Sequence, residues 1–135
     1  ETAATAGLIA LVIENDPALR LAMATLLESW GVSALDVAGE AEATALLAEI
    51  GIAPDVILAD FRLDGPRTGL DAIAALRAVH SALPAALVTA DRAEEVVAAC
   101  RAASVAFFGK PVAPARLRAF LASVASGGAG ARPVA

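Results

Sequence analysis

The stretch Val56-Ile57-Leu58-Ala59-Asp60 decides the fold, because it places four consecutive apolar residues directly before a carboxylate. Such an apolar run is typical of a strand buried on both faces, as in a parallel sheet covered by helices. In these sheets, ligands bind just outside the carboxyl ends of the strands. A charge at such a position rarely lacks a partner or a task. Asp60 is therefore the first candidate functional residue.

Apolar segments and helical patterns alternate on both sides of this strand. Strands that alternate with helices through short connections are typical of an α/β fold with a parallel sheet and right-handed crossovers. We therefore predict a flavodoxin-like, three-layer (βα)5 sandwich whose five strands, numbered along the chain, lie in the order 2-1-3-4-5. The other strands are expected at residues 8–13, 32–37, 85–89 and 104–108, and the helices at 17–30, 40–50, 69–80, 92–102 and 114–124.

The length of 135 residues fits one domain with a real core. We expect residues 1–7 to be a linker or a disordered end, residues 8–125 to form the domain, and residues 126–135 to be a disordered tail. Hydrophobic residues make up 59% of the chain, the net charge is −5 and the pI is about 4.7. This acidic balance argues against nucleic-acid binding, which needs a basic surface.

Membrane insertion and secretion are not indicated by the sequence. Charged residues interrupt every apolar run before it reaches the roughly 18 residues needed to span a bilayer, and the acidic start lacks the basic region of a signal peptide. The single cysteine, Cys100, excludes an internal disulfide and fits a small buried helix residue in a reducing compartment. We expect a soluble, cytoplasmic domain without direct membrane contact.

Polar residues follow or end four strands, and the predicted strand order brings them to one corner. Glu14 and Asn15 follow the first strand, next to Asp60, while Thr89 ends the fourth and Lys110, the only lysine, follows the fifth. Carboxylate and amide oxygens are suitable ligands for Mg²⁺. A carboxylate can also attack a phosphoryl group, and an ammonium and a hydroxyl can stabilise the oxygens of that group. The corner therefore predicts phosphoryl chemistry. The alternative is a set of polar strand ends that only satisfy one another.

Four motifs resemble, in order, the receiver domains of two-component signalling: residues 11–17, residues 54–60, Thr89-Ala90 and Gly109-Lys110-Pro111. The resemblance covers about residues 8–124. It implies that Asp60 accepts phosphate from a phosphohistidine on a histidine kinase or a histidine phosphotransfer domain.

The resemblance also implies a Mg²⁺ site made by Glu14, Asn15, Asp60 and the main-chain carbonyl of Arg62. The family usually has Asp where this chain has Asn15. Two carboxylates about 4 Å apart repel by roughly 4 kcal/mol at an effective dielectric of 20, so Asn15 should relieve repulsion in the empty site and weaken Mg²⁺ binding. Because an amide oxygen can still ligate, we expect phosphorylation that is weakened rather than abolished. The loop after Asp60 also lacks the family's usual Met-Pro, which bears on partner choice.

A conformational switch is the third implication of the resemblance. Thr89 would be the switch hydroxyl, and Phe107 would be the switch aromatic that fills the space left by Thr89. The resemblance also implies that the Lys110-Pro111 bond is cis. Phe107 has no hydroxyl, so it would act by burial alone; the alternative is an ordinary core aromatic. The face built from the fourth and fifth strands and helices would then change shape and could form a homodimer. Four charged residues either line this face or are solvated helix surface: Arg92, Glu95, Arg116 and Arg118.

Other readings of the motifs are less consistent with the sequence. His80, the sole histidine, is expected on the surface near a helix end. Ser104 and Pro111 stand where a P-loop needs Gly and Ser/Thr. Arg62 stands where an aspartate-based phosphatase usually carries a second acid.

Two hypotheses of different classes remain. The chain is either a phosphoacceptor in a His-to-Asp relay, rather than a conventional enzyme, or a pseudo-receiver that acts as a protein-interaction module without phosphate. Residues 26–31 and 63–70 most resemble receivers attached to hybrid sensor histidine kinases. We therefore expect a fragment of such a kinase rather than a stand-alone receiver.

Overall fold

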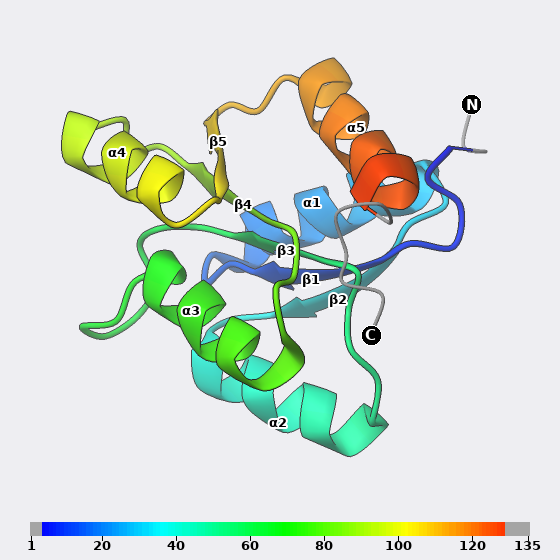
Figure 1. The fold of residues 1–135 in the computed structure, drawn as a ribbon, viewed down its shortest axis with the longest axis horizontal. Coiled ribbons are helices and arrows are strands. Elements are labelled where there is room, and N and C mark those ends of the chain that lie inside the picture. Colours follow the sequence, from blue (N-terminus) through cyan, green and yellow to red (C-terminus); the bar gives the residue numbers. More distant parts are fainter. Residues whose placement is uncertain (1–3, 129–135) are drawn as a thin grey trace.

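The computed structural model describes residues 4–128, which form a five-stranded parallel sheet between two layers of helices (Figure 1). The order β2-β1-β3-β4-β5 confirms the predicted α/β flavodoxin-like fold and its strand order. The strands are β1 (Ile9–Ile13), β2 (Ser33–Val37), β3 (Val56–Ala59), β4 (Ala85–Thr89) and β5 (Ala106–Gly109). The helices are α1 (Pro17–Ser29), α2 (Glu40–Ile50), α3 (Gly69–His80), α4 (Glu94–Ala102) and α5 (Pro114–Ser123).

Successive residues of the central strands pack into two separate cores, because side chains alternate across a sheet. Leu11 and Ile13 of β1 belong to the core under α2, α3 and α4, whereas Ala10 and Val12 belong to the core under α1 and α5 (Figure 1). All four residues of β3 are buried. By contrast, β2 is largely exposed or half-buried at one edge of the sheet, as its polar residues predict.

Local sequence signals set the helix ends that lie near the strand ends. The Asp16 carboxylate accepts hydrogen bonds from the main-chain N–H groups of Ala18 and Leu19, so α1 begins directly after β1. A capping box between Thr68 and Asp71 starts α3. These caps fix where the two helices leave the carboxyl end of the sheet.

Two predicted boundaries in the last third of the chain are wrong by about two residues. The strand expected at 104–108 is β5 at Ala106–Gly109, because Ser104 has a φ of 57° and belongs to the turn that follows α4. The helix expected at 92–102 begins at Glu94. It starts late because the Asp91 carboxylate accepts a hydrogen bond from the N–H of Ala93 and holds the preceding residues in a turn.

Both ends of the described chain are more ordered than expected. Thr5 is buried, and its hydroxyl donates a hydrogen bond to the Trp30 carbonyl at 2.6 Å, so it is not part of a loose linker. A turn of π-helix over Val124–Gly128 includes residues 126–128, which we assigned to a disordered tail. Residues 1–3 and 129–135 of those two predictions lie outside the described part of the chain.

Two further expectations concern burial and membrane insertion. Cys100 is buried in the core under α4, as predicted, and burial raises the pKa of its thiol. Within residues 4–128, no helix has the length and apolar character that crossing a bilayer requires.

Candidate functional site

Main-chain hydrogen bonds carry the sheet ladder one residue beyond the strands and fix the candidate residues at its carboxyl end. The N–H of Asp60 donates to the carbonyl of Ile13, at 3.0 Å, directly before Glu14. The N–H of Lys110 donates to the carbonyl of Thr89 at 2.8 Å. The backbone therefore brings Glu14 beside Asp60, and Lys110 beside Thr89, before any side chain interacts.

The Lys110 ammonium bridges the two carboxylates of the site. Its Nζ lies 2.8 Å from Glu14 Oε1 and 2.9 Å from Asp60 Oδ2. The side chains of Glu14, Asp60 and Lys110 are only 9%, 12% and 21% exposed, so these charge-assisted bonds form largely out of water. The three groups together carry one net negative charge.

A main-chain N–H group holds the second carboxylate oxygen of each acid, and the Arg20 side chain holds the Glu14 carbonyl. Glu14 Oε2 accepts a hydrogen bond from the N–H of Asp16 at 3.1 Å, and the Glu14 carbonyl accepts one from Arg20 Nη1 at 2.7 Å. Asp60 Oδ1 accepts a hydrogen bond from the N–H of Arg62 at 3.3 Å. Both carboxylates are thus oriented from two sides.

These contacts shift the ionisation of Asp60 and Lys110 in opposite directions. Burial raises the pKa of Asp60, but hydrogen bonds from Lys110, Thr89 and the Arg62 main chain and the Lys110 charge outweigh burial, so the net pKa is lowered. Burial lowers the pKa of Lys110, but hydrogen bonds and attraction to Glu14 and Asp60 raise it above its ordinary value. The site therefore holds a carboxylate and an ammonium, both charged, at neutral pH.

Thr89 lies on the second side of Asp60, at the base of the β4–α4 loop. It is buried, the N–H of Asp91 donates to its hydroxyl at 3.2 Å, and its side chain helps to lower the pKa of Asp60. The loop is also tied to the β3–α3 loop, because Arg62 Nη2 lies 2.6 Å from Asp91 Oδ2. Asp60, Arg62, Thr89 and Asp91 line one open cavity above the strand ends.

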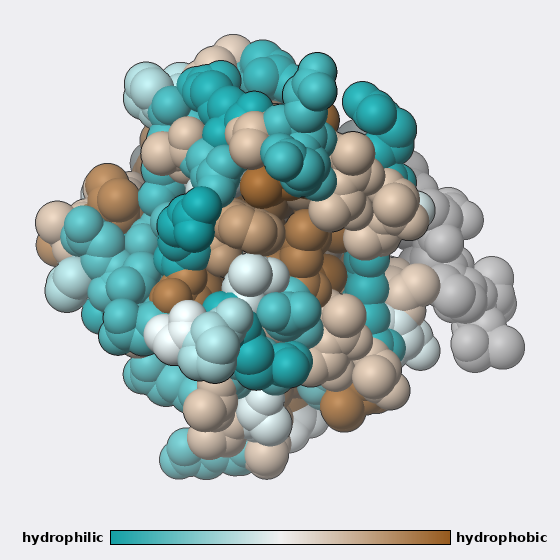
Figure 2. Space-filling model, turned by 90° about the vertical axis from the view of Figure 1, so that its left-hand side faces the viewer, coloured by the Kyte–Doolittle hydropathy of each residue, from teal (hydrophilic) through white to brown (hydrophobic). Residues whose placement is uncertain are grey.

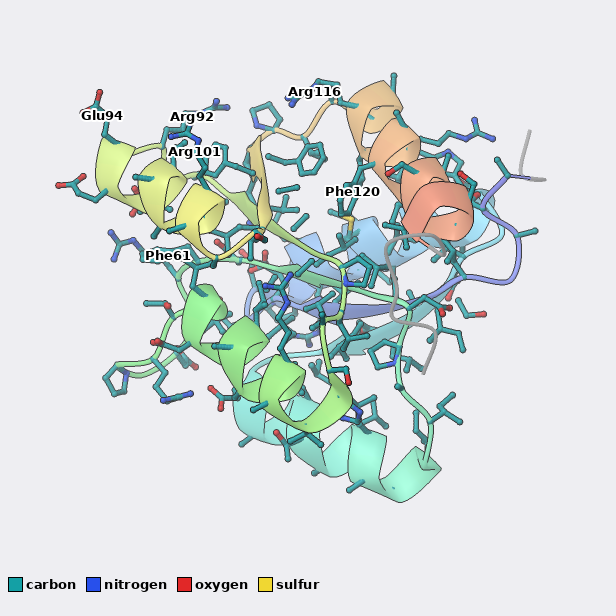
Figure 3. The ribbon with its side chains drawn as sticks, viewed as in Figure 1. Phe61, Arg92, Glu94, Arg101, Arg116 and Phe120 are labelled. Carbon is teal, nitrogen blue, oxygen red and sulfur yellow. The ribbon has the colours of Figure 1, made fainter. Side chains whose placement is uncertain are left out.

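A deeper and mainly apolar pocket adjoins the acids on the α1 side. It is lined by Glu14, Asp60 and Lys110 at the polar end. Apolar residues of α1 and of the segment after β5, among them Leu19, Met23 and Val112, line the rest. Figure 2, which looks onto the side of the molecule where Phe61 and Arg92 lie in Figure 3, shows apolar surface at the floor of a central hollow with a hydrophilic rim.

The predicted switch and surface residues have different surroundings. Phe107 is half-buried against the core under α2, α3 and α4, whereas the next residue, Phe108, lies in the opposite core. For Arg118 we left open a place on the predicted switch face or on a solvated helix surface; its guanidinium lies over the Trp30 ring, 5.6 Å from the centroid, in the α1 and α5 layer. Arg116 lies 5.2 Å from the centroid of the Phe108 ring.

Two other predicted features are local to the strand ends. The Lys110-Pro111 bond is cis, the conformation implied by the resemblance. Asn15 is half-buried next to Glu14 and takes no part in the Lys110 ion pairs.

Gly69 is a site residue that the sequence reasoning missed. A Cβ at this first residue of α3 would overlap the main-chain carbonyl of Asp60 and crowd the Leu87 side chain. A residue with poor helix propensity at a helix start is a signal that could have shown this close approach. Any side chain here would displace the Asp60 main chain.

The donor set suits a hard cation. Glu14 and Asp60 present carboxylate oxygens to one point, which the Lys110 ammonium occupies, and Asn15 follows Glu14 directly in the chain. No cluster of three or more His, Cys, Asp or Glu side chains with metal-binding geometry exists in the described residues. A bound cation would therefore depend on two carboxylates and on neutral oxygens.

The family model for the response regulator receiver domain matches residues 10–122 of this chain. The chain is a receiver domain. It therefore belongs to the receiver-domain family of two-component signalling. Receiver domains generally bind Mg²⁺ at the phosphorylation site and interact with histidine kinases or phosphotransfer proteins. No curated protein matches the chain in sequence.

Solved receiver structures share the fold at low sequence identity. A receiver domain protein from Clostridium thermocellum is 17% identical with a TM-score of 0.81, and the match covers 93% of this chain and 99% of that one. The chemotaxis protein CheY4 of Vibrio cholerae is 22% identical with a TM-score of 0.76, over 87% and 98% of the two chains. A receiver protein from Pseudomonas putida is 28% identical with a TM-score of 0.75, over 84% and 94%.

Proposed function

We propose that this receiver accepts a phosphoryl group on Asp60 from a phosphohistidine of a histidine kinase or histidine phosphotransfer domain. The observation that carries the proposal is the Lys110 ammonium, which contacts both Asp60 and Glu14 at the mouth of the sheet. A nucleophilic carboxylate beside a positive charge and a hydroxyl is the arrangement that phosphoryl transfer needs.

The chemistry follows from the groups around Asp60. One carboxylate oxygen attacks phosphorus, the bond from phosphorus to the donor imidazole nitrogen breaks, and the nitrogen keeps the electron pair. The product is an acyl phosphate on Asp60. The depressed pKa of Asp60 keeps the attacking group ionised, and Lys110 and the Thr89 hydroxyl would stabilise phosphoryl oxygens.

Mg²⁺ is the cofactor that we propose for this site. Glu14, Asn15, Asp60 and the main-chain carbonyl of Arg62 would hold it. When bound, it would neutralise phosphoryl oxygens that the single net negative charge of the site would otherwise repel.

Phosphorylation would be read out through Thr89 and Phe107. A phosphoryl group on Asp60 draws the Thr89 hydroxyl inward, and the half-buried Phe107 moves into the space that Thr89 leaves. The β4–α4–β5–α5 face then changes shape and becomes available to a partner or to a second copy of the chain. We also propose that the chain is the receiver of a hybrid sensor histidine kinase, from the resemblance of residues 26–31 and 63–70.

Mass spectrometry after incubation with a small acyl phosphate and Mg²⁺ tests the phosphoacceptor. We expect one added phosphoryl group in the wild type and none in Asp60→Asn, and beryllofluoride should bind only the wild type. Arg67→Ala is a matched control, because Arg67 pairs with Glu40 on another part of the surface and its loss should leave labelling intact. Phosphate on Asp60→Asn would refute the assignment.

A pseudo-receiver is the second candidate function, and Asn15 is the observation that favours it. Asn15 removes one of the charges that usually bind the cation, so the site could serve only as part of an interaction module. A wild-type chain that takes neither phosphate nor beryllofluoride at saturating Mg²⁺ would establish this candidate instead.

A further inference from the structure

The Arg92 guanidinium packs against the backbone of Gly109, at the end of β5. A Cβ on Gly109 would overlap the guanidinium of Arg92, so the absence of a side chain there creates the space that Arg92 fills. Figure 3 shows Arg92 beside the start of α4. The two residues are thus fitted to one another, although one ends β5 and the other lies in the β4–α4 loop.

The guanidinium makes a specific bond from this position. Arg92 Nη2 donates to the main-chain carbonyl of Lys110 at 2.7 Å. The same residue carries the ammonium that bridges Glu14 and Asp60. The N–H of Lys110 is already bonded to the Thr89 carbonyl, so Arg92 holds the other polar group of the Lys110 backbone.

Arg92 also belongs to the loop that follows Thr89, which ends β4 three residues earlier in the chain. Asp91 ties this loop to Arg62 on the β3–α3 side, and Arg92 ties it to Lys110 on the β5–α5 side. The loop is therefore held from both sides of the carboxyl end of the sheet. A movement of Thr89 would reach the Lys110 backbone directly, through the Thr89 carbonyl, and also through Arg92.

We propose that Arg92, seated on Gly109, is a positioning residue that fixes the Lys110 backbone and thereby keeps the Lys110 ammonium on Glu14 and Asp60. It touches neither carboxylate itself. Because Arg92 is exposed, water competes for its bond, and the effect of its loss should be modest. The connection from Arg92 to Thr89 matters only if the proposed phosphoacceptor function holds. The positioning of Lys110 by Arg92 does not depend on that function.

The single lysine of the chain allows a test that needs no phosphorylation. Acetic anhydride acylates free amines, and an ammonium held by two carboxylates reacts slowly. Mass spectrometry can follow acylation of Lys110 against the α-amino group of the same chain. We expect acylation to be about fivefold faster in Arg92→Ala, the effect of roughly one hydrogen bond.

Variants of Arg92 and Gly109 distinguish a positioning role from general destabilisation of the fold. Gly109→Ala should match Arg92→Ala, because the methyl group displaces the guanidinium. The double variant should be no faster than either single one, since both remove the same contact. Arg101→Ala, which removes an exposed arginine from the last turn of α4, should leave the rate unchanged.

Phosphorylation by a small acyl phosphate provides the second measurement. Its rate should fall about fivefold in Arg92→Ala and in Gly109→Ala. Unchanged Lys110 acylation in Arg92→Ala, or effects that multiply in the double variant, would overturn the positioning role even if phosphorylation persists. A wild type that takes no phosphate would refute the proposed function alone, because the acylation rates still decide the role of Arg92. If Gly109→Ala does not fold, Arg92→Ala against Arg101→Ala decides.

Discussion

Lys110 and Arg77 lie at opposite ends of the sheet, and each basic side chain holds several oxygens, with different consequences. Lys110 holds two carboxylates after β1 and β3. Arg77, in the last turn of α3, donates only to main-chain carbonyls that precede β4 and β5. Its three bonds are Nε to Leu83 at 2.9 Å, Nη1 to Ala103 at 2.6 Å and Nη2 to Ser104 at 3.0 Å.

The two ends of the sheet differ in the oxygens that the basic side chains hold: carboxylates at Lys110 and main-chain carbonyls at Arg77. Carbonyl oxygens cannot titrate, and as amides they are poor nucleophiles, so the Arg77 end can only hold the fold together. Carboxylates can bind a cation or attack phosphorus, so the Lys110 end can change its state. The pKa values agree: burial lowers the pKa of Arg77, whereas the carboxylates outweigh burial and raise that of Lys110.

The largest effect is expected from Lys110→Met. Without the ammonium, Glu14 and Asp60 repel each other in a largely buried site, so the free energy of unfolding at pH 7 should fall by about 2 to 3 kcal/mol. Chemical denaturation measures this loss. Adding Asp60→Asn to Lys110→Met should restore much of the stability. If the double variant is no more stable than Lys110→Met, repulsion between the acids is not the cause.

Arg77→Ala should separate stability from function. It leaves three carbonyls without their donor, partly accessible to water, so the free energy of unfolding should fall by about 2 kcal/mol. Phosphorylation of the folded fraction should be unchanged, because the amino end of the sheet does not contact Asp60. A matched loss of phosphorylation rate would show that the two ends are coupled and would break the comparison.

The pH dependence of stability sharpens the same contrast. The lowered pKa of Asp60 gives stability that is present above its ordinary value of 3.8 and is lost as the pH falls through the folded value. The raised pKa of Lys110 gives stability that is present below 10.5 and is lost as the pH rises through its folded value. Urea unfolding across pH should show both losses in the wild type. An acid limb that is equally steep in Asp60→Asn would contradict this origin.

The smallest effect is expected from Asn15→Asp. A third carboxylate next to Glu14 should raise Mg²⁺ affinity by about tenfold, which corresponds to roughly 1.4 kcal/mol, and slightly lower the stability of the metal-free protein. Titration calorimetry measures both the wild type and the variant. No gain in affinity on restoring the charge would show that Asn15 does not weaken the metal site.

Much of the fold could be predicted because its signals are local. The buried run of β3 and the alternation of strands with helices gave the sheet and its order, and Asp16-Pro17 gave the start of α1. The start of β5 could not be predicted, because Arg77 holds the Ala103 and Ser104 carbonyls in a turn from a distant helix. The position of Arg118 could not be decided for a similar reason, since its partner Trp30 comes from another element.

By itself, the sequence determined which polar residues stand at the ends of buried strands, because strand length and turn residues are encoded within a few positions. Only the tertiary structure decided which of these groups meet: Lys110 with both Glu14 and Asp60, Gly69 against the Asp60 carbonyl, and Arg92 on Gly109. The two Lys110 contacts join residues that are 96 and 50 positions apart in the chain. Their distances depend on how the loops pack, and no local pattern of residues specifies that packing.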